Sequence, residues 1–446
     1  MIDHRSKEDF LDWLYGLSAH GIKLGLKSIT ELLRRLGDPQ DSFSSVHVAG
    51  TDGKGSICAT ISSILIESGV TTGLFVSPHL VSFNERISVN GSLISDDDLA
   101  AAAAVTVPHV TAMAEEGMRC TFFEVTTAIA FMYFKKKGVE YAVVEVGLGG
   151  RFDATNVLIP EVCVISNIST EHTEYLGDTV EEIAFEKAGI IKPCVPCVTL
   201  NQDLAFSIIE KVAEENGSPL TCVDPRDIEV LSLFEDHTDF TYKEEGYSIS
   251  IPGSCQAKNA VLAIEAVSNL KIYGHKCRCR VKSGLNKVNW PCRIQRIPDT
   301  PFIIDVTHTA AGSVCLCSDI MEIYGNVTLV FGILGGKDID HITGNLSEIA
   351  NNIIITQPDT DRAVPSAKVA EHMSAFKKVD KVTDNLEDAM EAALDLAGDD
   401  LILVTGSFYI AGNALKWLER KYPGSSTDCL RRIRTTEPSL ADRRKA

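Results

Sequence analysis

The chain has too little glycine and proline for a low-complexity or collagen-like protein, with 32 Gly and 16 Pro among 446 residues. It also lacks an apolar run that could cross a membrane or serve as a signal peptide. The first ten residues have no apolar core, and the longest run of small residues, LAAAAAVTVPHVTAMA, is interrupted by Pro108 and His109. Positive charge is scarce, because 42 Lys and Arg stand against 61 Asp and Glu, a net charge of −19. These shortages argue against a disordered chain, a membrane protein and a nucleic-acid-binding protein.

The cysteines do not form the dense framework of a small secreted protein. There are 13 of them, an odd number, scattered along the chain, and several lie in apolar patterns, as Cys163 and Cys315 do. A reduced, cytoplasmic compartment is therefore expected. The length predicts two, possibly three, domains.

Short β-branched runs alternate with amphipathic helical stretches, which predicts an α/β fold with mainly parallel sheets. The first series has strands expected over 43–50, 141–147 and 162–169 and helices over 55–69 and 203–217. Residues 237–253 instead alternate polar and apolar types around a Glu-Gly turn, which predicts an appended antiparallel hairpin.

A Pro- and Arg-rich segment, NWPCRIQRIPDTP, precedes a second series of strands expected over 301–306, 327–334, 351–358 and 399–406. We therefore predict a larger nucleotide-binding domain over 1–297 and a smaller, Rossmann-like α/β domain over 298–423. Residues 424–446 have no apolar periodicity and carry net positive charge, so a disordered tail is predicted there.

Residues 46–56, VHVAGTDGKGS, place an apolar strand, a glycine-rich turn and a helix in succession. This arrangement cradles phosphates, because glycines let backbone N–H groups approach and the helix N-terminus is partly positive. Lys54 adds a full charge near the β- and γ-phosphates. The spacing differs from the common G-x-x-x-x-G-K-[ST] motif, since Ser56 lies one residue late. The alternative is an ordinary strand–helix turn.

Two further segments bring charged groups to strand ends. Glu145 lies inside an otherwise apolar strand, and a buried carboxylate needs a partner. That partner is either a metal ion near the nucleotide or an ion pair with Arg151 or another cation. Glu171, His172 and Lys187 follow another strand. Ligands gather at the carboxyl ends of parallel strands, although a lone His is more often an ordinary hydrogen-bonding residue.

Eight motifs occur in the order seen in the folylpolyglutamate synthase/dihydrofolate synthase family of the Mur ligase superfamily, which the chain resembles from about Leu11 to about Leu418. They are HVAGTDGKGS, GLFVSPHLVSFNERI, TFFEVTTAIAF, VEVGLGGRFDATN, EHTEYLGDTVEEIAFEKAGIIK, WPCR, FGILGGKD and TGSFYIAG. Shared ancestry does not by itself fix the substrate.

The resemblance implies roles for particular residues. It assigns catalysis to Lys54, Lys187, His308 and Ser407. It assigns ATP binding to Gly50, Thr51, Asp52, Gly53, Lys54, Gly55, Ser56, Asn259, Arg293 and Asp305. It assigns Mg²⁺, in two ions, to Ser77, Glu145, His172 and a carbamylated Lys187, because carbamylation turns an ammonium into an anionic oxygen ligand. It assigns the pterin substrate to Leu24, Gly25, Thr121, Phe152, Asp153 and Ala154.

The implied reaction is ATP-dependent, ADP-forming amide formation. ATP would phosphorylate the carboxylate of a folate-like pterin, and the amine of glutamate would attack the resulting acyl phosphate. Such a ligase serves folate biosynthesis, polyglutamylation and one-carbon metabolism, and the resemblance implies a cytoplasmic monomer. Which pterin is used, and whether the enzyme adds one glutamate or several, stays open.

The chain departs from the family pattern in the second domain. The family has Asp-Gly-Ala-His-Asn-Pro where this chain has DVTHTA at 305–310, so glutamate specificity is in doubt. Cys255 replaces a His, Cys292 a Gly and Glu171 an Asp.

Three other functions stay open. A sister ligase of the same superfamily would join a different amino acid or acceptor. A nucleotide-dependent switch or kinase would use the phosphate loop alone. A zinc module would use Cys194 and Cys197, although a lone C-x-x-C is a weak signal.

Overall fold

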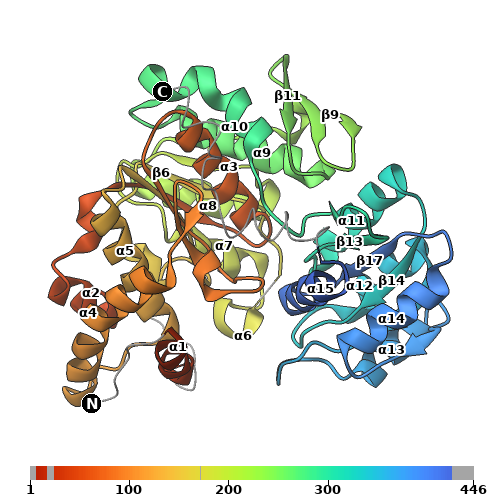
Figure 1. Cartoon of the computed structure of the whole chain (residues 1–446). Helices are drawn as coiled ribbons and strands as arrows, with labels where there is room; N and C mark the ends of the chain where they lie inside the picture. Colours follow the sequence, from red (N-terminus) through yellow and green to blue (C-terminus); the bar gives the residue numbers. More distant parts are fainter. Residues whose placement is uncertain (1–6, 18–24, 171, 424–446) are drawn as a thin grey trace, which may run out of the picture.

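The computed structural model describes residues 7–17, 25–170 and 172–423. Leu24, Glu171 and the tail predicted from residue 424 lie outside the described residues. Within them the chain forms two α/β units that lie side by side, and a small antiparallel sheet is attached to the first (Figure 1). The predicted fold class is confirmed.

The larger unit is built on an eight-stranded sheet in the order β4-β3-β2-β5-β1-β6-β7-β8, which is parallel except where β3 pairs with β2 and β4. Its strands are β1 (Ser44–Ala49), β2 (Thr72–Phe75), β3 (Ile87–Val89), β4 (Ser92–Leu93), β5 (Tyr141–Glu145), β6 (Val162–Ile165), β7 (Cys197–Thr199) and β8 (Leu220–Cys222). Its helices are α1 (Lys7–Gly16), α2 (Lys27–Arg35), α3 (Lys54–Glu67), α4 (Asp96–Glu115), α5 (Phe122–Lys137), α6 (Thr173–Leu176), α7 (Val180–Ala188), α8 (Asp203–Glu215), α9 (Ser254–Ser268) and α10 (Val281–Lys287).

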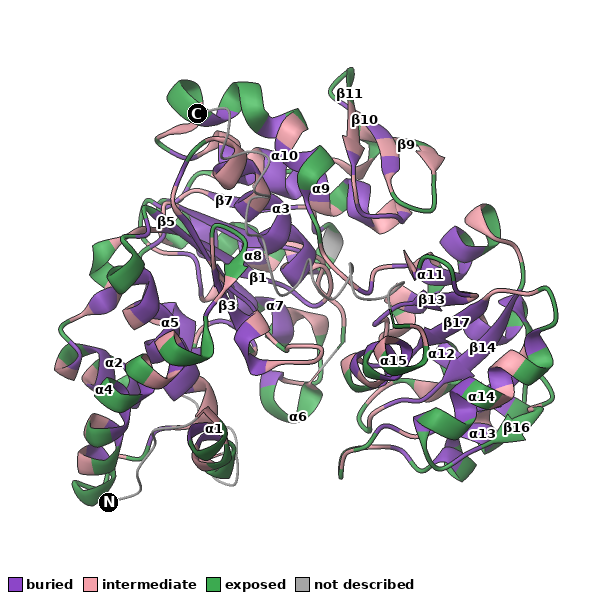
Figure 2. Cartoon of the chain, in the orientation of Figure 1, coloured by how far each residue is buried: buried purple, intermediate pink, exposed green. Residues whose placement is uncertain are grey.

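Both faces of this sheet are buried, which explains its apolar strands (Figure 2). Successive side chains of a strand point to opposite faces. On β5, Val143 therefore packs in the cluster with α3 and α9, and Val144 packs in the cluster with α4 and α5. Each strand is thus fixed in register, and the carboxyl ends of β1, β5 and β6 meet at one edge.

The predicted antiparallel hairpin is present, with a third strand added. The strands β9 (Ile228–Leu233), β10 (Thr238–Tyr242) and β11 (Glu245–Ile249) form a separate sheet. The turn lies at Lys243 and Glu244, both with positive φ of 49° and 67°. The predicted Glu-Gly turn at 245–246 is therefore wrong by two residues, because Glu245 and Gly246 already pair with Tyr242 and Thr241 inside the ladder.

The second unit has a six-stranded sheet in the order β12-β13-β17-β14-β15-β16, parallel except for β12. Its strands are β12 (Gln295–Arg296), β13 (Phe302–Ile304), β14 (Val327–Phe331), β15 (Ala350–Ile355), β16 (Lys381–Val382) and β17 (Ile402–Thr405). Its helices are α11 (Ala310–Ile323), α12 (Ile339–Ile349), α13 (Ser366–Ser374), α14 (Leu386–Ala397) and α15 (Phe408–Lys421). The strand β12 precedes residue 297 but pairs with β13 of the second unit. The domain boundary at 297 stays a prediction.

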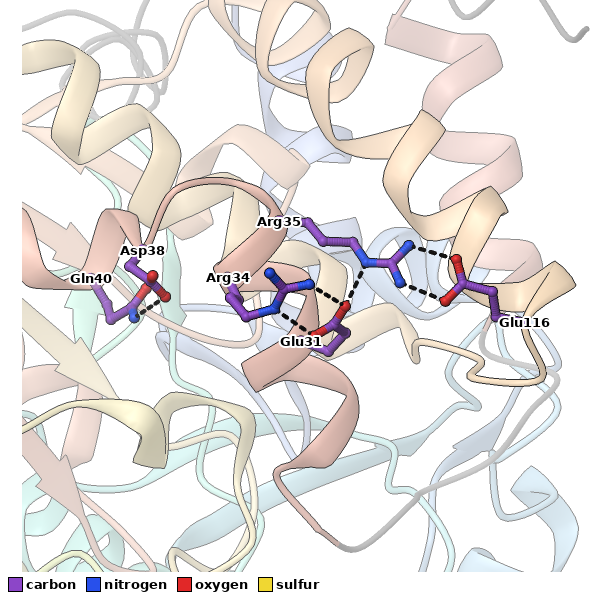
Figure 3. Close-up of polar contacts among 6 residues, drawn as sticks. All are labelled: Glu31, Arg34, Arg35, Asp38, Gln40 and Glu116. Atoms are coloured by element: carbon purple, nitrogen blue, oxygen red, sulfur yellow. Dashed lines mark hydrogen bonds and ion pairs between the residues drawn. The ribbon is translucent and has the colours of Figure 1, made fainter.

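A charged network joins two outer helices of the larger unit (Figure 3). Arg35 donates from Nε to Glu31 Oε1 at 2.7 Å and makes a two-pronged contact with Glu116, which follows α4. Hydrogen bonds from Arg34 and Arg35 lower the pKa of Glu31 to about 2. The network is partly exposed, so it links α2 to the end of α4 without adding much stability.

The two units touch where α15 faces the loop after β2 (Figure 1). Gly412 of α15 lies so close to this loop that a Cβ there would collide with the carbonyl oxygen of Leu80. Leu80 and Val81 in turn pack against the core of the second unit. The loop after β2 is therefore an anchor for the second unit.

We expect Gly412→Ala to lower the free energy of unfolding by about 1–3 kcal/mol, the usual cost of overpacking. The backbone of Leu80 cannot move aside as a flexible side chain could. Denaturant unfolding checks this. Gly274→Ala is the matched control, since no atom lies within 4 Å of a Cβ at Gly274. Equal stability of the two variants would contradict the tight contact.

Candidate functional site

The glycine-rich loop connects β1 to α3 at the edge where the strand ends meet. Its backbone is held by the loop after β6, because Thr51 N donates to Asn167 O at 2.8 Å and Asp52 N donates to the Asn167 side chain at 2.9 Å. Gly53 has φ of 82° and precedes the first residue of α3. A Cβ at Gly53 would collide with Asn259 Oδ1 of α9. Glycine is thus required at 53, and Asn259 lies against the loop.

Two ammonium groups converge on one carbonyl of this loop. Lys54 Nζ donates to Gly50 O at 3.1 Å and to Thr51 O at 2.9 Å. Lys187 Nζ, on a side chain that is only 3% exposed, donates to the same Gly50 O at 2.6 Å. Two positive charges near one carbonyl oxygen repel each other, so an anionic group beside them would be favoured.

The phosphate loop also carries an unsatisfied hydroxyl. Ser56 is fully buried in the first turn of α3, and its Oγ has no hydrogen-bond partner. A buried polar atom without a partner costs free energy unless a ligand supplies one. A phosphate oxygen or a cation bound beside Ser56 would supply the missing partner of its hydroxyl.

Glu145 ends β5 with a side chain that is 4% exposed. Its carboxylate accepts a hydrogen bond from the backbone N–H of Ser77 at 2.9 Å. Burial raises the pKa of Glu145, and the charge of Lys54 opposes this. An ion pair between Glu145 and Arg151 is not formed, because Arg151 Nε lies 3.7 Å from Glu186 Oε1 instead. The alternative of another cation stays open, since the charge of Lys54 acts on Glu145.

A small cavity behind the loop joins several of the predicted residues. Gly50, Lys54, His172 and Lys187 all line it. His172 adopts a left-handed backbone, with φ of 52°, just before α6. The predicted ligands Ser77, Glu145, His172 and Lys187 thus surround the phosphate loop, and their metal-binding role stays a prediction. Among the described residues, no group of three or more His, Cys, Asp or Glu side chains that could hold a metal ion gathers, here or elsewhere.

A cleft of about 1020 Å³ separates the two units. It is lined by most of the residues predicted from sequence: Gly25, Thr51, Asp52, Gly53, Lys54, Gly55, Ser56, Ser77, Thr121, Glu145, Phe152, Asp153, Ala154, His172, Asn259, Arg293, Asp305, His308 and Ser407. The structure therefore brings most of the predicted nucleotide, metal and pterin residues to one cleft, whereas Gly50 and Lys187 line the smaller cavity behind the loop.

Arg293 and Asp305 sit where the second unit begins. The Arg293 guanidinium donates to Cys292 O at 3.0 Å and lies 5.7 Å from the centre of the Phe408 ring. Burial lowers the pKa of Arg293, and nearby Asp305 opposes the shift. Asp305 accepts the backbone N–H groups of Ile294 and Thr307 at 3.0 and 2.7 Å. The Asp305 carboxylate thus fixes the backbone of the loop that follows β13 and ties it to the segment before β12.

The altered 305–310 loop is well accommodated. Val306 is buried in the core of the second unit and is not among the residues with positive φ. The backbone freedom that glycine would give is therefore not needed there. Thr309 caps α11 by accepting from Gly312 N at 3.0 Å, and it donates to Asp52 Oδ2 at 3.1 Å. Thr309 thus bridges the second unit and the phosphate loop.

Of the residues predicted to bind the pterin, some are exposed in the cleft and others hold the protein's own backbone. Phe152 is 42% exposed in the cleft. Asp153, in contrast, accepts hydrogen bonds from Gly147 N, Leu148 N and the hydroxyl and N–H of Thr155. Its oxygens shape the loop after β5 rather than reaching freely into the cleft. Thr121 and Ser407 cap α5 and α15.

Arg86, in the motif GLFVSPHLVSFNERI, is a further residue of the cleft to which the sequence alone gives no role. The side chain is buried, lines the cleft, donates to His79 Nδ1 at 2.8 Å and lies 5.3 Å from the centre of the Phe122 ring. The sequence signal for such a residue is an arginine just before an apolar strand, as in FNERI, because arginines are rarely buried without a reason.

Both units of the chain match known protein families. Residues 48–267 match the Mur ligase middle domain, and residues 292–408 match the Mur ligase, glutamate ligase domain. The dihydrofolate synthase/folylpolyglutamate synthase of Bacillus subtilis is 35% identical over 92% of this chain and 99% of its own. This chain belongs to the folylpolyglutamate synthase/dihydrofolate synthase family.

Solved structures of the family superpose on the whole fold. The Mycobacterium tuberculosis folylpolyglutamate synthase complexed with ADP has a TM-score of 0.83 at 30% identity, covering 92% of this chain and 98% of its own. A bifunctional folylpolyglutamate synthase/dihydrofolate synthase with Mn, AMPPNP and L-glutamate bound has a TM-score of 0.79 at 27% identity, covering 92% and 98%. The family fold is thus shared over both units. Among the described residues, no helix has the length and apolar character needed to cross a membrane.

Glu145→Gln should remove the part of nucleotide binding that depends on Mg²⁺. We expect ADP with Mg²⁺ to raise the melting temperature of the unmodified protein by a few degrees, as ligand well above its Kd does, and Glu145→Gln to lose that increment. Because burial raises the pKa of Glu145, the increment should also fade as pH falls and the carboxylate is protonated. Thermal unfolding with and without a chelator measures it.

The matched control is Glu210→Gln, an exposed residue on α8. It should keep the full increment. An equal response of Glu145→Gln and the control would show that Glu145 holds no metal.

Proposed function

We propose that the protein is an ATP-dependent, ADP-forming ligase that joins glutamate to the carboxylate of a folate-like pterin through an acyl phosphate. One observation carries the proposal: Lys54, Glu145 and Arg293 converge on a single cleft between the two units. Family membership supports it, and so do the ADP, AMPPNP and L-glutamate present in the related structures.

The chemistry explains why these residues are needed. A carboxylate is a poor electrophile, so transfer of the γ-phosphoryl group first gives it a good leaving group. The phosphate and carboxylate oxygens repel one another as they approach. Lys54 and Arg293 would neutralise that charge, with Arg293 suited to forked phosphate contacts. Closure of the cleft by the second unit would keep water from the acyl phosphate.

A divalent metal fits the residues present. Ser77, Glu145 and His172 would hold one Mg²⁺, and Lys187, once carbamylated, a second. The unpaired Ser56 hydroxyl and the poorly compensated Glu145 carboxylate support this placement. When bound, Mg²⁺ supplies charge neutralisation at the phosphate oxygens. The two ammonium groups that share Gly50 O support carbamylation, since it would replace one positive charge with a negative one.

Glutamate would bind where the second unit meets the phosphate loop. His308 and Ser407 line this part of the cleft, and Thr309 bridges to Asp52. The pterin would lie toward Gly25, Thr121 and Phe152. In solution the enzyme would act as a monomer, because both walls of the cleft come from one chain.

The decisive experiment is an amino-acid competition. The protein is incubated with ATP, Mg²⁺, dihydropteroate or a reduced folate, and an equimolar mixture of amino acids, and the products are identified by mass. We expect glutamate products to predominate, because a site built for a substrate's polar groups rejects analogues that lack them by large factors.

A variant tests the altered loop. Restoring Gly, Ala, Asn and Pro at 306, 307, 309 and 310 should lower the KM for glutamate and leave the preference unchanged. A clear preference of the unmodified protein for another amino acid would favour a sister ligase, and phosphoryl transfer without amide formation would favour a kinase.

A further inference from the structure

Two cysteines face each other across the boundary between the units. Cys255 is the second residue of α9 in the larger unit, and Cys315 lies in α11 of the second unit. Both are half-buried free thiols, and both line the cleft. This position gives dissolved oxidants access that a core cysteine lacks.

A hydrogen bond beside them fixes the two helices. Ser254 N donates to Asp319 Oδ2 at 2.9 Å. Ser254 adjoins Cys255, and Asp319 lies one helical turn after Cys315, so the bond holds the two cysteine positions together. A hydrogen bond between the thiols lowers the pKa of Cys315 to about 7 and raises that of Cys255.

The other cysteines differ in ways that make them useful references. Cys163 and Cys197 are opposite one another on β6 and β7, but both are fully buried and burial raises both pKa values. Cys222 is exposed on β8. Only thiolates attack oxidants readily, so the buried strand pair is chemically inert.

We propose that Cys255 and Cys315 are a redox modification site, which a hydroperoxide converts to a disulfide that ties the two units together and arrests the enzyme. The disulfide itself is independent of the ligase function, whereas its effect on turnover rests on the proposed function.

The chemistry balances with hydrogen peroxide as the oxidant. The Cys315 thiolate attacks one peroxide oxygen, the O–O bond breaks, and a sulfenic acid and hydroxide form; the hydroxide takes up a proton to become water. The Cys255 sulfur then attacks the sulfenic sulfur, forming the S–S bond and releasing a second water. Two electrons pass from the two thiols to the peroxide, and a dithiol reductant reverses the change.

A disulfide here would act on nucleotide exchange. Asn259 lies one turn after Cys255 on α9 and contacts the phosphate loop at Gly53. Tying α9 to α11 would hold the cleft at one width, so substrates could no longer enter and leave freely. Bound nucleotide in the cleft should conversely shield both thiols.

The test treats the full-length protein with hydrogen peroxide. A digest without reductant should contain a peptide pair joined through Cys255 and Cys315, and turnover should fall at least about tenfold and return with dithiothreitol. Cys315→Ala should give no such pair and resist inactivation, and Cys255→Ala provides a second version should the first misfold. Cys222→Ala should behave as the unmodified protein does.

Several outcomes would overturn the proposal. They are a different cysteine pairing, overoxidation of Cys315 without a link, a linked protein that keeps full turnover, or equal inactivation of Cys315→Ala. Because peptide mass reports the link directly, an absence of ligase activity would count against the proposed function and leave the modification site to be judged on the link alone.

Discussion

Lys54→Ala should abolish ligation, with kcat reduced at least about 10²–10³-fold, the scale of losing one preorganised charged group at a phosphoryl-transfer site. Among the residues that the structure describes, the Lys54 ammonium donates only to the backbone carbonyls of Gly50 and Thr51, and Lys54 lines the cleft. It lies outside the apolar core clusters, so the melting temperature should change little. Product formation with saturating ATP, together with thermal unfolding, measures both effects.

Lys211→Ala, an exposed lysine on α8, is the matched control and should keep full activity. Unchanged turnover of Lys54→Ala would remove the phosphate-loop assignment. A loss of turnover with a large fall in melting temperature would point instead to a structural role.

Lys187→Arg should also lose activity, by about 10²-fold, although the positive charge is kept. The Lys187 side chain is buried with its ammonium 2.6 Å from Gly50 O, and a guanidinium cannot react with CO₂ to form an anionic carbamate. A permanent charge would stay beside Lys54.

Dependence on CO₂ separates this chemistry from a packing effect. The unmodified protein should lose turnover when bicarbonate is removed and regain it on addition, and Lys187→Arg should show no such response. Turnover of the variant close to that of the unmodified protein, or a bicarbonate response in the variant, would show that carbamylation is idle here.

Much of the fold could be predicted because both sheets are buried on two faces. Strands such as β5 and β14 then appear as short apolar runs between helical patterns. The short strands β3 and β4, the last two at one side of the larger sheet, are not predicted, although Asn90 and Gly91, both with positive φ, form a common hairpin turn between them.

The candidate site could also be predicted only in part. Lys54 follows the end of β1 and Glu145 ends β5, so the local sequence is enough to predict their positions. The bond from Thr309 to Asp52, the buried Arg86 and the contact of Cys255 with Cys315 depend on how separate elements face one another. No local pattern encodes that arrangement, and it emerges only from the packing of the two units.

The loop after β2 joins two tasks within five residues. Ser77 holds the Glu145 carboxylate through its backbone N–H, while Leu80 and Val81 are wedged against the second unit beside Gly412. A rotation of the second unit would therefore displace the loop after β2, and with it the backbone N–H of Ser77 that orients Glu145. If Glu145 binds Mg²⁺ as proposed, opening of the cleft would loosen the metal ligands in the same movement, and release of product and release of Mg²⁺ would be coupled.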